Sequence, residues 1–299
     1  MNRGYVYVLL CYFLIGISYP VAKEAMNQVP IWLFTSLTFA MAFVMLMPFA
    51  RFVDKARLRA IGLRVWLAVS VQSLLGAMLY TVFLLYGLES ASAIMAALFT
   101  SLAPALVLSL SSLLLKERLT LRKLLAITLA VAGILVLTLP AADGGHTTWL
   151  GVGFLLLSTL CTAISVIAAN RLDVTLPPIT LSAGVCLTGC LFSLPMALGQ
   201  AATFDWHGLG ASTWWVMVYY AALVWAAPYV LFFMGVTRIP ASATGMAIAV
   251  VPLAATFFAI AFYGETLHLS DTIALLLVTI SIIAAESSPL ATADTAQTT

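Results

Sequence analysis

Two neighbouring residues of opposite charge, Lys23 and Glu24, stand near the end of a long apolar run. Ionisable side chains inside a membrane-spanning helix are costly and usually serve a substrate or a proton. Lys23 is therefore a candidate partner for a substrate carboxylate, and Glu24 is a candidate proton carrier for coupled transport. The alternative is structural, with both side chains at the outer end of the helix reaching to water.

Seven aromatic residues inside apolar runs are candidates for the lining of a binding cavity: Tyr12, Tyr19, Tyr80, Phe83, Phe99, Trp225 and Tyr229. Aromatic and small polar groups suit a neutral or zwitterionic, partly apolar molecule. The other acidic residues considered stand at the ends of apolar runs or between them, which disfavours a pump for lipophilic cations: Glu89, Glu117, Asp143, Glu265 and Asp271. The alternative for each aromatic residue is contact with lipid or a neighbouring helix.

Several other chemistries are disfavoured by residue placement. All three histidines lie between apolar runs, and neither a G-x-S-x-G motif nor a Walker A motif occurs, so neither an intramembrane enzyme nor an ATP-driven pump is expected. The four cysteines lie within apolar runs without histidine or carboxylate at their depth: Cys11, Cys161, Cys186 and Cys190. We expect no metal, no cofactor and no nucleic-acid partner.

Composition identifies the elements that must position these residues. The 299-residue chain is 63% hydrophobic and 8% charged, with a mean hydropathy of +1.11, whereas soluble domains carry roughly 25% charged residues. Runs of this length in lipid must be helices, because backbone groups there need internal hydrogen bonds. We predict an all-α integral membrane protein with ten transmembrane helices, at about 5–25, 31–50, 65–87, 91–115, 121–140, 149–170, 178–199, 212–235, 240–262 and 271–286.

The basic residues predict the orientation. With the N-terminus in the cytoplasm, 12 of the 13 Lys and Arg residues fall on the inner side and only Lys23 does not, which is the asymmetry typical of inner-membrane proteins. Ten spans then place both termini in the cytoplasm.

A motif occurs twice, 148 residues apart. "KERL" at 116–119 and "GETL" at 264–267 each carry a glutamate 13 residues after a proline, Pro104 before Glu117 and Pro252 before Glu265. Five spans separate the copies, so the second copy crosses the membrane in the opposite sense. We predict two inverted five-helix repeats at 1–141 and 142–286, followed by a disordered cytoplasmic tail at 287–299.

The repeated residues have predicted structural roles. Each proline follows a ridge of small residues and should act in bending or close packing. We expect Glu117 and Glu265 to cap the N–H groups of the helix that follows each of them, rather than to bind a ligand. Inverted repeats are a common way to build alternating access to a central site, and so indicate a transporter.

The stretch "LYTVFLLYGLESASAIMAALFTSLAPALVLSLSSLLLKERLT" at 79–120 resembles the signature of the drug/metabolite transporter superfamily, in its ten-helix branch with two EamA-type repeats. "GISYPVAKEAM" (16–26) and "VTRIPASATGMAIAVVPLAATFFAIAFYGETL" (236–267) resemble its first helix and second repeat, although the tryptophan expected in the sixth span is absent.

This resemblance implies a secondary transporter of the bacterial inner membrane. Bacterial aromatic amino-acid exporters are the subgroup that the chain resembles, which implies export of aromatic or neutral amino acids. The alternative is a carrier of drugs, nucleotide sugars or lipid-linked metabolites in the same superfamily. The expected partners are a small-molecule substrate and the lipid bilayer, with protons as a candidate coupling ion and a monomer sufficient for transport.

Overall fold

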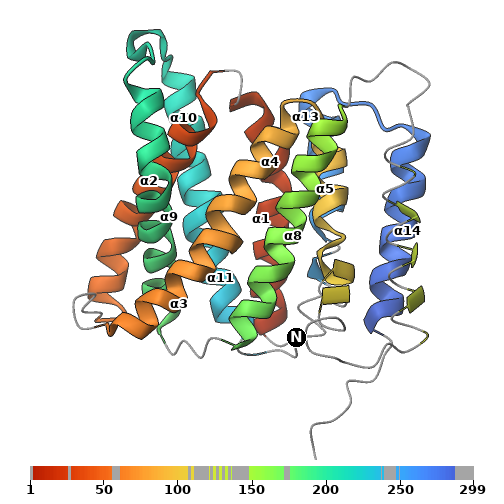
Figure 1. Ribbon diagram of the computed structural model, residues 1–299, viewed down its shortest axis with the longest axis horizontal. Coiled ribbons are helices and arrows are strands. Elements are labelled where there is room, and N and C mark those ends of the chain that lie inside the picture. Colours follow the sequence, from red (N-terminus) through yellow and green to blue (C-terminus); the bar gives the residue numbers. More distant parts are fainter. Residues whose placement is uncertain are drawn as a thin grey trace, which may run out of the picture.

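The computed structural model is a bundle of helices that run roughly parallel or antiparallel to one another (Figure 1). Its described part contains helices and no strands. The described residues are 3–25, 28–55, 61–106, 109–110, 148–171, 176–236, 238, 247–248 and 250–286, with positions 121, 124–125, 128–129, 132–133 and 136.

The helices follow the apolar runs closely. Those of the first half are α1 (Arg3–Ala25), α2 (Ile31–Phe52), α3 (Leu63–Ser73), the π-helix η2 (Leu74–Leu79), α4 (Tyr80–Leu88) and α5 (Ala93–Thr100). Those of the second half are α8 (Trp149–Arg171), α9 (Pro178–Ala201), the short 3-10 turn η3 (Trp206–Gly208), α10 (Ala211–Tyr220), the π-helix η4 (Ala221–Ala226), α11 (Ala227–Val236), α13 (Val250–Tyr263) and α14 (Leu269–Glu286). Five described stretches are long and apolar enough to cross a membrane: Arg3–Lys23, Ile31–Phe52, Leu63–Leu88, Pro178–Ala201 and Ala211–Gly235.

Where both halves are described, their helices match at an offset of about 148 residues. The continuous helical stretch α3–η2–α4 covers 63–88, and α10–η4–α11 covers 211–236. Both stretches contain a π-helix near their middle, and both begin after a glycine, Gly62 or Gly210. Equivalent segments of the two halves therefore form the same irregular helix.

Each half also packs closely against the other through an equivalent glycine. A Cβ atom at Gly87 of α4 would lie 2.5 Å from a methyl carbon of Leu155 on α8, and a Cβ at Gly235 of α11 would lie 2.5 Å from a methyl carbon of Val8 on α1. Gly87 and Gly235 are 148 residues apart, so each half uses the same glycine to approach the first helix of the other half. The helix surfaces can meet this closely only because glycine has no side chain.

Helix N-termini are capped across the two halves as well. Asp54, just after α2, accepts hydrogen bonds from the backbone N–H and hydroxyl of Thr180 in the first turn of α9, both at 2.8 Å. Gln200 at the end of α9 accepts one from the backbone N–H of Leu33 in the first turn of α2, at 3.1 Å. Each half thus satisfies donors that the other half leaves free at a helix start.

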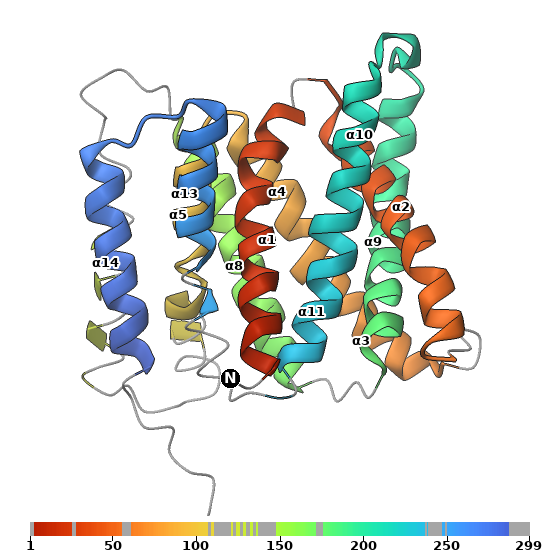
Figure 2. The same ribbon diagram turned by 180° about the vertical axis from the view of Figure 1, so that it is seen from behind.

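The paired helices cross the bundle in opposite directions. Lys23 near the end of α1 bonds to Glu265, which also accepts the backbone N–H of Ala93 at the start of α5. Thr148 at the start of α8 donates a hydrogen bond to Ser90, just before α5, at 3.0 Å. The end of α1 therefore lies at the same end of the bundle as the beginning of α8, as the views from both sides show (Figures 1 and 2). This is the inverted arrangement that the sequence repeat predicts.

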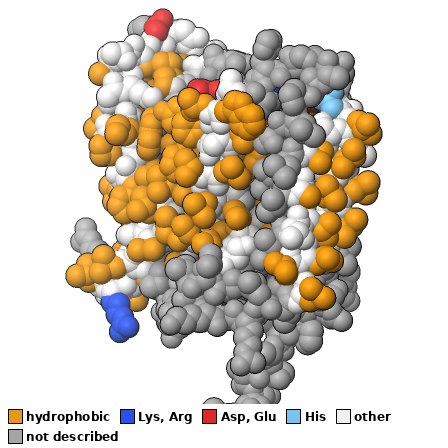
Figure 3. Space-filling model, turned by 45° about the vertical axis from the view of Figure 1, so that its right-hand side comes forward, with side chains coloured by type: hydrophobic (Ala, Val, Ile, Leu, Met, Phe, Trp, Pro, Cys, Tyr) orange, Lys and Arg blue, Asp and Glu red, His pale blue; other side chains and the backbone are white. Residues whose placement is uncertain are grey.

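The outer surface suits a lipid environment. Hydrophobic side chains cover the middle of the face seen in Figure 3, and the visible charged side chains lie near its upper and lower ends. Many large apolar side chains on the outside are well exposed, including Phe52, Leu63, Trp149, Phe262 and Leu269. The charged residues whose side chains are described likewise stand at helix ends or between helices: Arg3, Lys23, Arg51, Asp54, Lys55, Arg64, Glu89, Asp205, Arg238, Glu265 and Asp271.

Candidate functional site

A chain of hydroxyl groups joins three helices inside the bundle. The Tyr19 hydroxyl donates to Thr100 Oγ1 at 2.7 Å and lies 2.8 Å from the Tyr80 hydroxyl. Because the Tyr19 proton is used on Thr100, Tyr80 is the donor in the second bond. Tyr19 is fully buried. Two of the predicted cavity residues are therefore in direct contact, in a setting without charge.

The chain of hydroxyl groups ends at Thr100, where the predicted fourth span is interrupted. Helix α5 stops at Thr100, a turn occupies 101–102, and helix resumes at 103–106. Pro104 lacks the N–H that would bond to the carbonyl of Thr100 and so interrupts the helical pattern. Pro252 stands at the equivalent place, shortly after a turn at Ile248, where the backbone N–H of Val251 bonds to the Ile248 carbonyl at 2.9 Å. The hinge role of both prolines remains a prediction.

A second group of aromatic side chains links the two halves. The Trp225 ring lies 5.8 Å from the Tyr229 ring and 4.2 Å from the Phe39 ring, and its indole N–H points to Thr38 Oγ1 at 3.3 Å. The Tyr229 hydroxyl donates to the backbone carbonyl of Gly76 in η2 at 3.0 Å. Tyr229 lies in α11, which directly continues η4, the segment that contains Trp225, so this bond joins the helix after one described π-helix to the other described π-helix, η2. Such segments are often found at functional sites.

The remaining predicted cavity residues lie elsewhere around this core. Phe99 is fully buried, and its carbonyl accepts the Thr159 hydroxyl of α8 at 3.1 Å. Phe83 stacks on Phe154 of α8 with ring centroids 6.1 Å apart. Tyr12 meets the edge of the Phe232 ring at 6.4 Å. The described ring contacts and hydrogen bonds place none of these three against the Tyr19 and Tyr80 hydroxyls.

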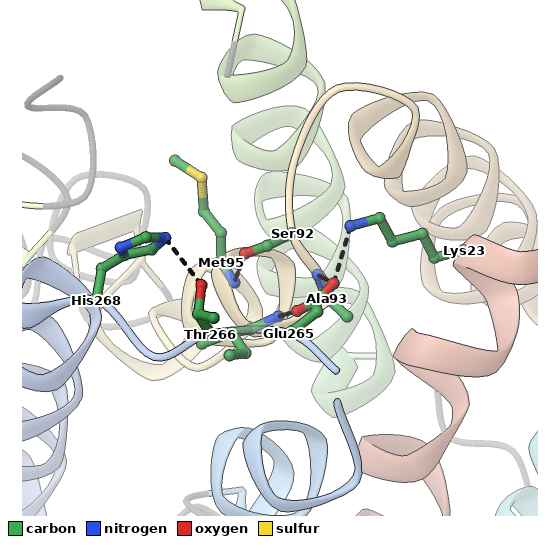
Figure 4. A network of polar contacts seen from close by, with 8 residues as sticks. Lys23, Ser92, Ala93, Met95, Glu265, Thr266 and His268 are labelled. Atoms are coloured by element: carbon green, nitrogen blue, oxygen red, sulfur yellow. Dashed lines mark hydrogen bonds and ion pairs between the residues drawn. The ribbon is translucent and has the colours of Figure 1, made fainter. Parts of the chain in front are cut away.

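At one end of the bundle, a charged cluster ties the halves together. Glu265 Oε1 lies 2.8 Å from Lys23 Nζ, and the Glu265 carboxylate accepts the backbone N–H groups of Ala93 at 3.1 Å and Ile94 at 3.4 Å. Figure 4 shows Lys23 and the start of α5 converging on this carboxylate. We call the three partners, Lys23, Glu265 and the first turn of α5, the Lys23–Glu265 clasp.

The clasp completes the cap of α5. Ser92 accepts the N–H of Met95 through its side chain at 3.0 Å and that of Ala96 through its carbonyl at 3.0 Å, which leaves the N–H groups of Ala93 and Ile94 for Glu265. A carboxylate is favourable here because the N-terminus of a helix carries partial positive charge. The prediction that Glu265 caps the helix following it is wrong: it caps α5 of the other half.

Lys23 consequently has a protein partner, and the role predicted for it with a substrate stays a prediction. Glu24 lies within α1, but its side chain falls outside the described residues, as does Glu117 altogether. Sequence reasoning missed Thr100, whose only signal was a polar residue within an apolar run. No group of three His, Cys, Asp or Glu side chains suited to a metal occurs in the described part of the chain.

Comparison with known proteins gives a consistent result. Residues 2–139 and 149–285 match the EamA-like transporter family. A transporter of uncharacterised function from Bacillus subtilis, YetK, is 29% identical over 255 residues, covering 84% of this chain and 77% of its own length. The threonine/homoserine exporter RhtA of Salmonella typhimurium is 27% identical over 144 residues, covering 47% of this chain and 46% of the exporter.

The fold is likewise found among solved structures. A crystal structure without a functional description superposes with a TM-score of 0.68 at 19% identity, covering 95% of this chain and 97% of its own. Together with the match to both halves, this confirms the prediction of an all-α membrane protein built from ten transmembrane helices in two inverted five-helix repeats.

Proposed function

The chain belongs to the EamA-like transporter family, and from this we propose that it is a secondary transporter that exports neutral amino acids or similar zwitterionic metabolites across the bacterial inner membrane. The match to RhtA, which is named as a threonine/homoserine exporter, supports this class of cargo. We further propose that a monomer is sufficient and that both termini are cytoplasmic.

The uncharged character of the polar groups described between the helices is the observation that carries the proposed cargo. The polar groups that the helices bring together are hydroxyls, an indole N–H and backbone carbonyls, beside aromatic rings. A cavity for anionic phosphates would need several basic groups and one for lipophilic cations would need an acid. Lys23, the charge nearest these groups along α1, is already neutralised by Glu265 at 2.8 Å.

The inverted relation of the two halves supports a mechanism of alternating access. In alternating access, inverted repeats exchange shapes so that a site between them opens to one side and then to the other. The Lys23–Glu265 clasp holds α1, α5 and the segment after α13 together, so we propose that it closes the extracellular end in this conformation. Residues 1–141 and 142–286 would then be the units that move, with Pro104 and Pro252 at their hinges and Glu24 as a candidate proton carrier.

Transport by the purified protein in liposomes tests the proposal. Liposomes loaded with unlabelled L-threonine or L-phenylalanine should take up the same labelled amino acid by counterflow, and an imposed pH gradient should change the rate if protons are coupled. Tetraphenylphosphonium and a nucleotide sugar serve as the competing cargoes. Movement of either competitor without movement of an amino acid would replace this function with the alternative carrier.

Orientation has a separate test. Single cysteines at positions 117 and 265 should react with an impermeant maleimide from opposite sides of the membrane. Reaction from the same side would contradict the inverted arrangement of the two glutamates and the proposed closure of the extracellular end.

A further inference from the structure

Three basic side chains at the connection between α2 and α3 have no partner in the described part of the protein. Arg51, Lys55 and Arg64 are exposed, and their side chains make no ion pair or hydrogen bond. Asp54 is the one acidic residue between Arg51 and Arg64, and its Oδ2 accepts the backbone N–H and the hydroxyl of Thr180 instead. Three positive charges are therefore left for a partner from outside the chain.

The fold holds the end of α2 and the start of α3 at the same place. Asp54, just after α2, bonds to Thr180 in the first turn of α9. A Cβ atom at Gly184 of α9 would lie 3.3 Å from a methyl carbon of Val69 and 3.8 Å from the Trp66 ring, both on α3. Thr180 and Gly184 are one helical turn apart, about 6 Å along α9. The end of α2 and the start of α3 therefore lie beside the same stretch of α9, at the lower left of Figure 1.

Large apolar side chains stand next to these basic ones and are well exposed, with Phe52 at 80% and Leu63 at 76%. They continue the apolar outer surface of the bundle down to the level of the charges. Figure 3 shows Lys or Arg side chains projecting below an apolar surface at its lower left. We call this combination of residues the basic corner: Arg51, Lys55 and Arg64 with Phe49, Phe52, Val53 and Leu63.

The backbone at Lys55 is unfavourable in a way that suggests a role for its side chain. Its φ of 53° lies in the left-handed region, and Lys55 is the one residue other than glycine with positive φ in the described part of the chain. This conformation is costly for a residue that has a Cβ, and glycine would adopt it without strain. A lysine kept at such a position is more easily explained by what its charge contacts than by packing, because the side chain is exposed.

The equivalent connection of the second half has a different character. The offset of 148 residues relates 51–64 to 199–212, where the sequence holds Asp205 and neither lysine nor arginine. The large exposed side chain there is aromatic, Trp206 in η3. The repeated fold therefore does not require basic residues at this connection, and they belong to one end of the bundle only.

We propose that the basic corner binds the headgroup of an anionic phospholipid, with the acyl chains against its apolar side chains. Clusters of basic residues beside a membrane-spanning helix attract anionic lipids. A lipid fits better than a soluble phosphate, because apolar side chains lie next to the cations. Since Asp54 of the same connection caps α9 of the other half, a bound lipid would hold α2, α3 and α9 together and stabilise the protein.

Thermal unfolding of the purified full-length protein in detergent tests this proposal. The probes are dioctanoyl phosphatidylglycerol, the uncharged-overall dioctanoyl phosphatidylcholine, and inorganic phosphate. Phosphatidylglycerol should raise the unfolding temperature of the wild type, whereas phosphatidylcholine and phosphate should not. Stabilisation by phosphate alone to the same extent would overturn the lipid assignment, and so would equal stabilisation by the two lipids.

The triple variant Arg51→Gln, Lys55→Gln, Arg64→Gln removes the three charges. A basic residue near an anionic membrane surface contributes about a fivefold gain in affinity, so the half-effective concentration of phosphatidylglycerol should rise about 100-fold. The double variant Arg51→Lys, Arg64→Lys keeps the charge and should stay within about fivefold of the wild type. An unchanged half-effective concentration in the triple variant would overturn the proposal.

A matched control removes the same charge from another connection predicted on the same side: Arg118→Gln, Arg122→Gln, Lys123→Gln. This variant should change the half-effective concentration less than about fivefold. An equal loss in the two triple variants would overturn the proposal, because it would show attraction by the whole basic surface rather than by the basic corner.

Two features keep the test independent of other outcomes. Salt screens exposed charges, so about 0.5 M KCl should weaken the effect of phosphatidylglycerol on the wild type even if a variant fails to fold. Lack of this salt dependence would contradict binding by exposed cations. The measurement is of lipid binding and not of transport, so a failure of the proposed cargo leaves the result unaffected.

Discussion

Replacing Glu265 by glutamine should open the end of the protein that the Lys23–Glu265 clasp closes. Glutamine keeps the shape of the side chain but has one acceptor oxygen in place of two and no charge. The carboxylate now serves Lys23 at 2.8 Å and two backbone N–H groups of α5 at 3.1 and 3.4 Å, with only 14% of its side chain exposed. Glutamine has one side-chain oxygen and cannot accept hydrogen bonds from all three donors, and its NH₂ group, itself a donor, would face the Lys23 ammonium or a backbone N–H of α5.

The magnitude follows from the three contacts. Because 42% of the Lys23 side chain is exposed, the ion pair contributes only about 0.2–1 kcal/mol. The charge at the α5 N-terminus adds about 0.3–1 kcal/mol, and one lost hydrogen bond adds about 0.5–1.5 kcal/mol. Together these give about 1–3.5 kcal/mol, which raises the ratio of open to closed molecules about 5- to 400-fold.

Spin labels at the exposed positions Glu89 and Thr266 can measure this ratio as a distance distribution. The wild type should show mainly the closed distance, and Glu265→Gln should add a longer one. Lys23→Met is the graded comparison, because it removes the ion pair and leaves the carboxylate on α5, so its effect should stay below about fivefold. An unchanged distribution in Glu265→Gln, or equal effects of both variants, would refute the reasoning.

Three further predictions concern packing, the hydroxyl chain and the aromatic group. Gly16→Ala should lower the free energy of unfolding by about 1–3 kcal/mol, because the added Cβ would lie 2.7 Å from the Cβ of a neighbouring alanine on α13. Gly153→Ala, with open space around the added Cβ, should not lower it. Thermal unfolding in detergent measures both. Tyr19→Phe should cost about 1–3 kcal/mol in the same assay by leaving Thr100 and Tyr80 without their shared partner. Trp225→Ala should abolish amino-acid counterflow at normal expression, and full activity would exclude it from the binding region.

The sequence predicted the helices and their duplication well because both depend on local signals. Apolar runs determine where a helix can cross lipid, and the spacing from Pro104 to Glu117 recurs from Pro252 to Glu265. The interruption after Thr100 also follows from the proline, since the missing N–H is a property of one residue.

Contacts between distant residues could not be predicted in the same way. Glu265 and Lys23 are 242 residues apart, and no local pattern indicates that a carboxylate will cap a helix of the other half. The π-helices were not predicted either, because an apolar run indicates a helix but not the extra residue per turn that η2 and η4 contain.

The capping of one half by the other has a consequence for how the protein is made. The backbone N–H of Ala93 bonds to Glu265, which is synthesised 172 residues later. The backbone N–H of Leu33 bonds to Gln200, which is synthesised 167 residues later. At about 5–20 residues per second, the first half spends roughly 10–30 s in the membrane with helix starts that lack their final partners. During this interval it depends on water, lipid headgroups or the insertion machinery, and a ribosome that stalls before residue 200 leaves a half-protein with open helix ends.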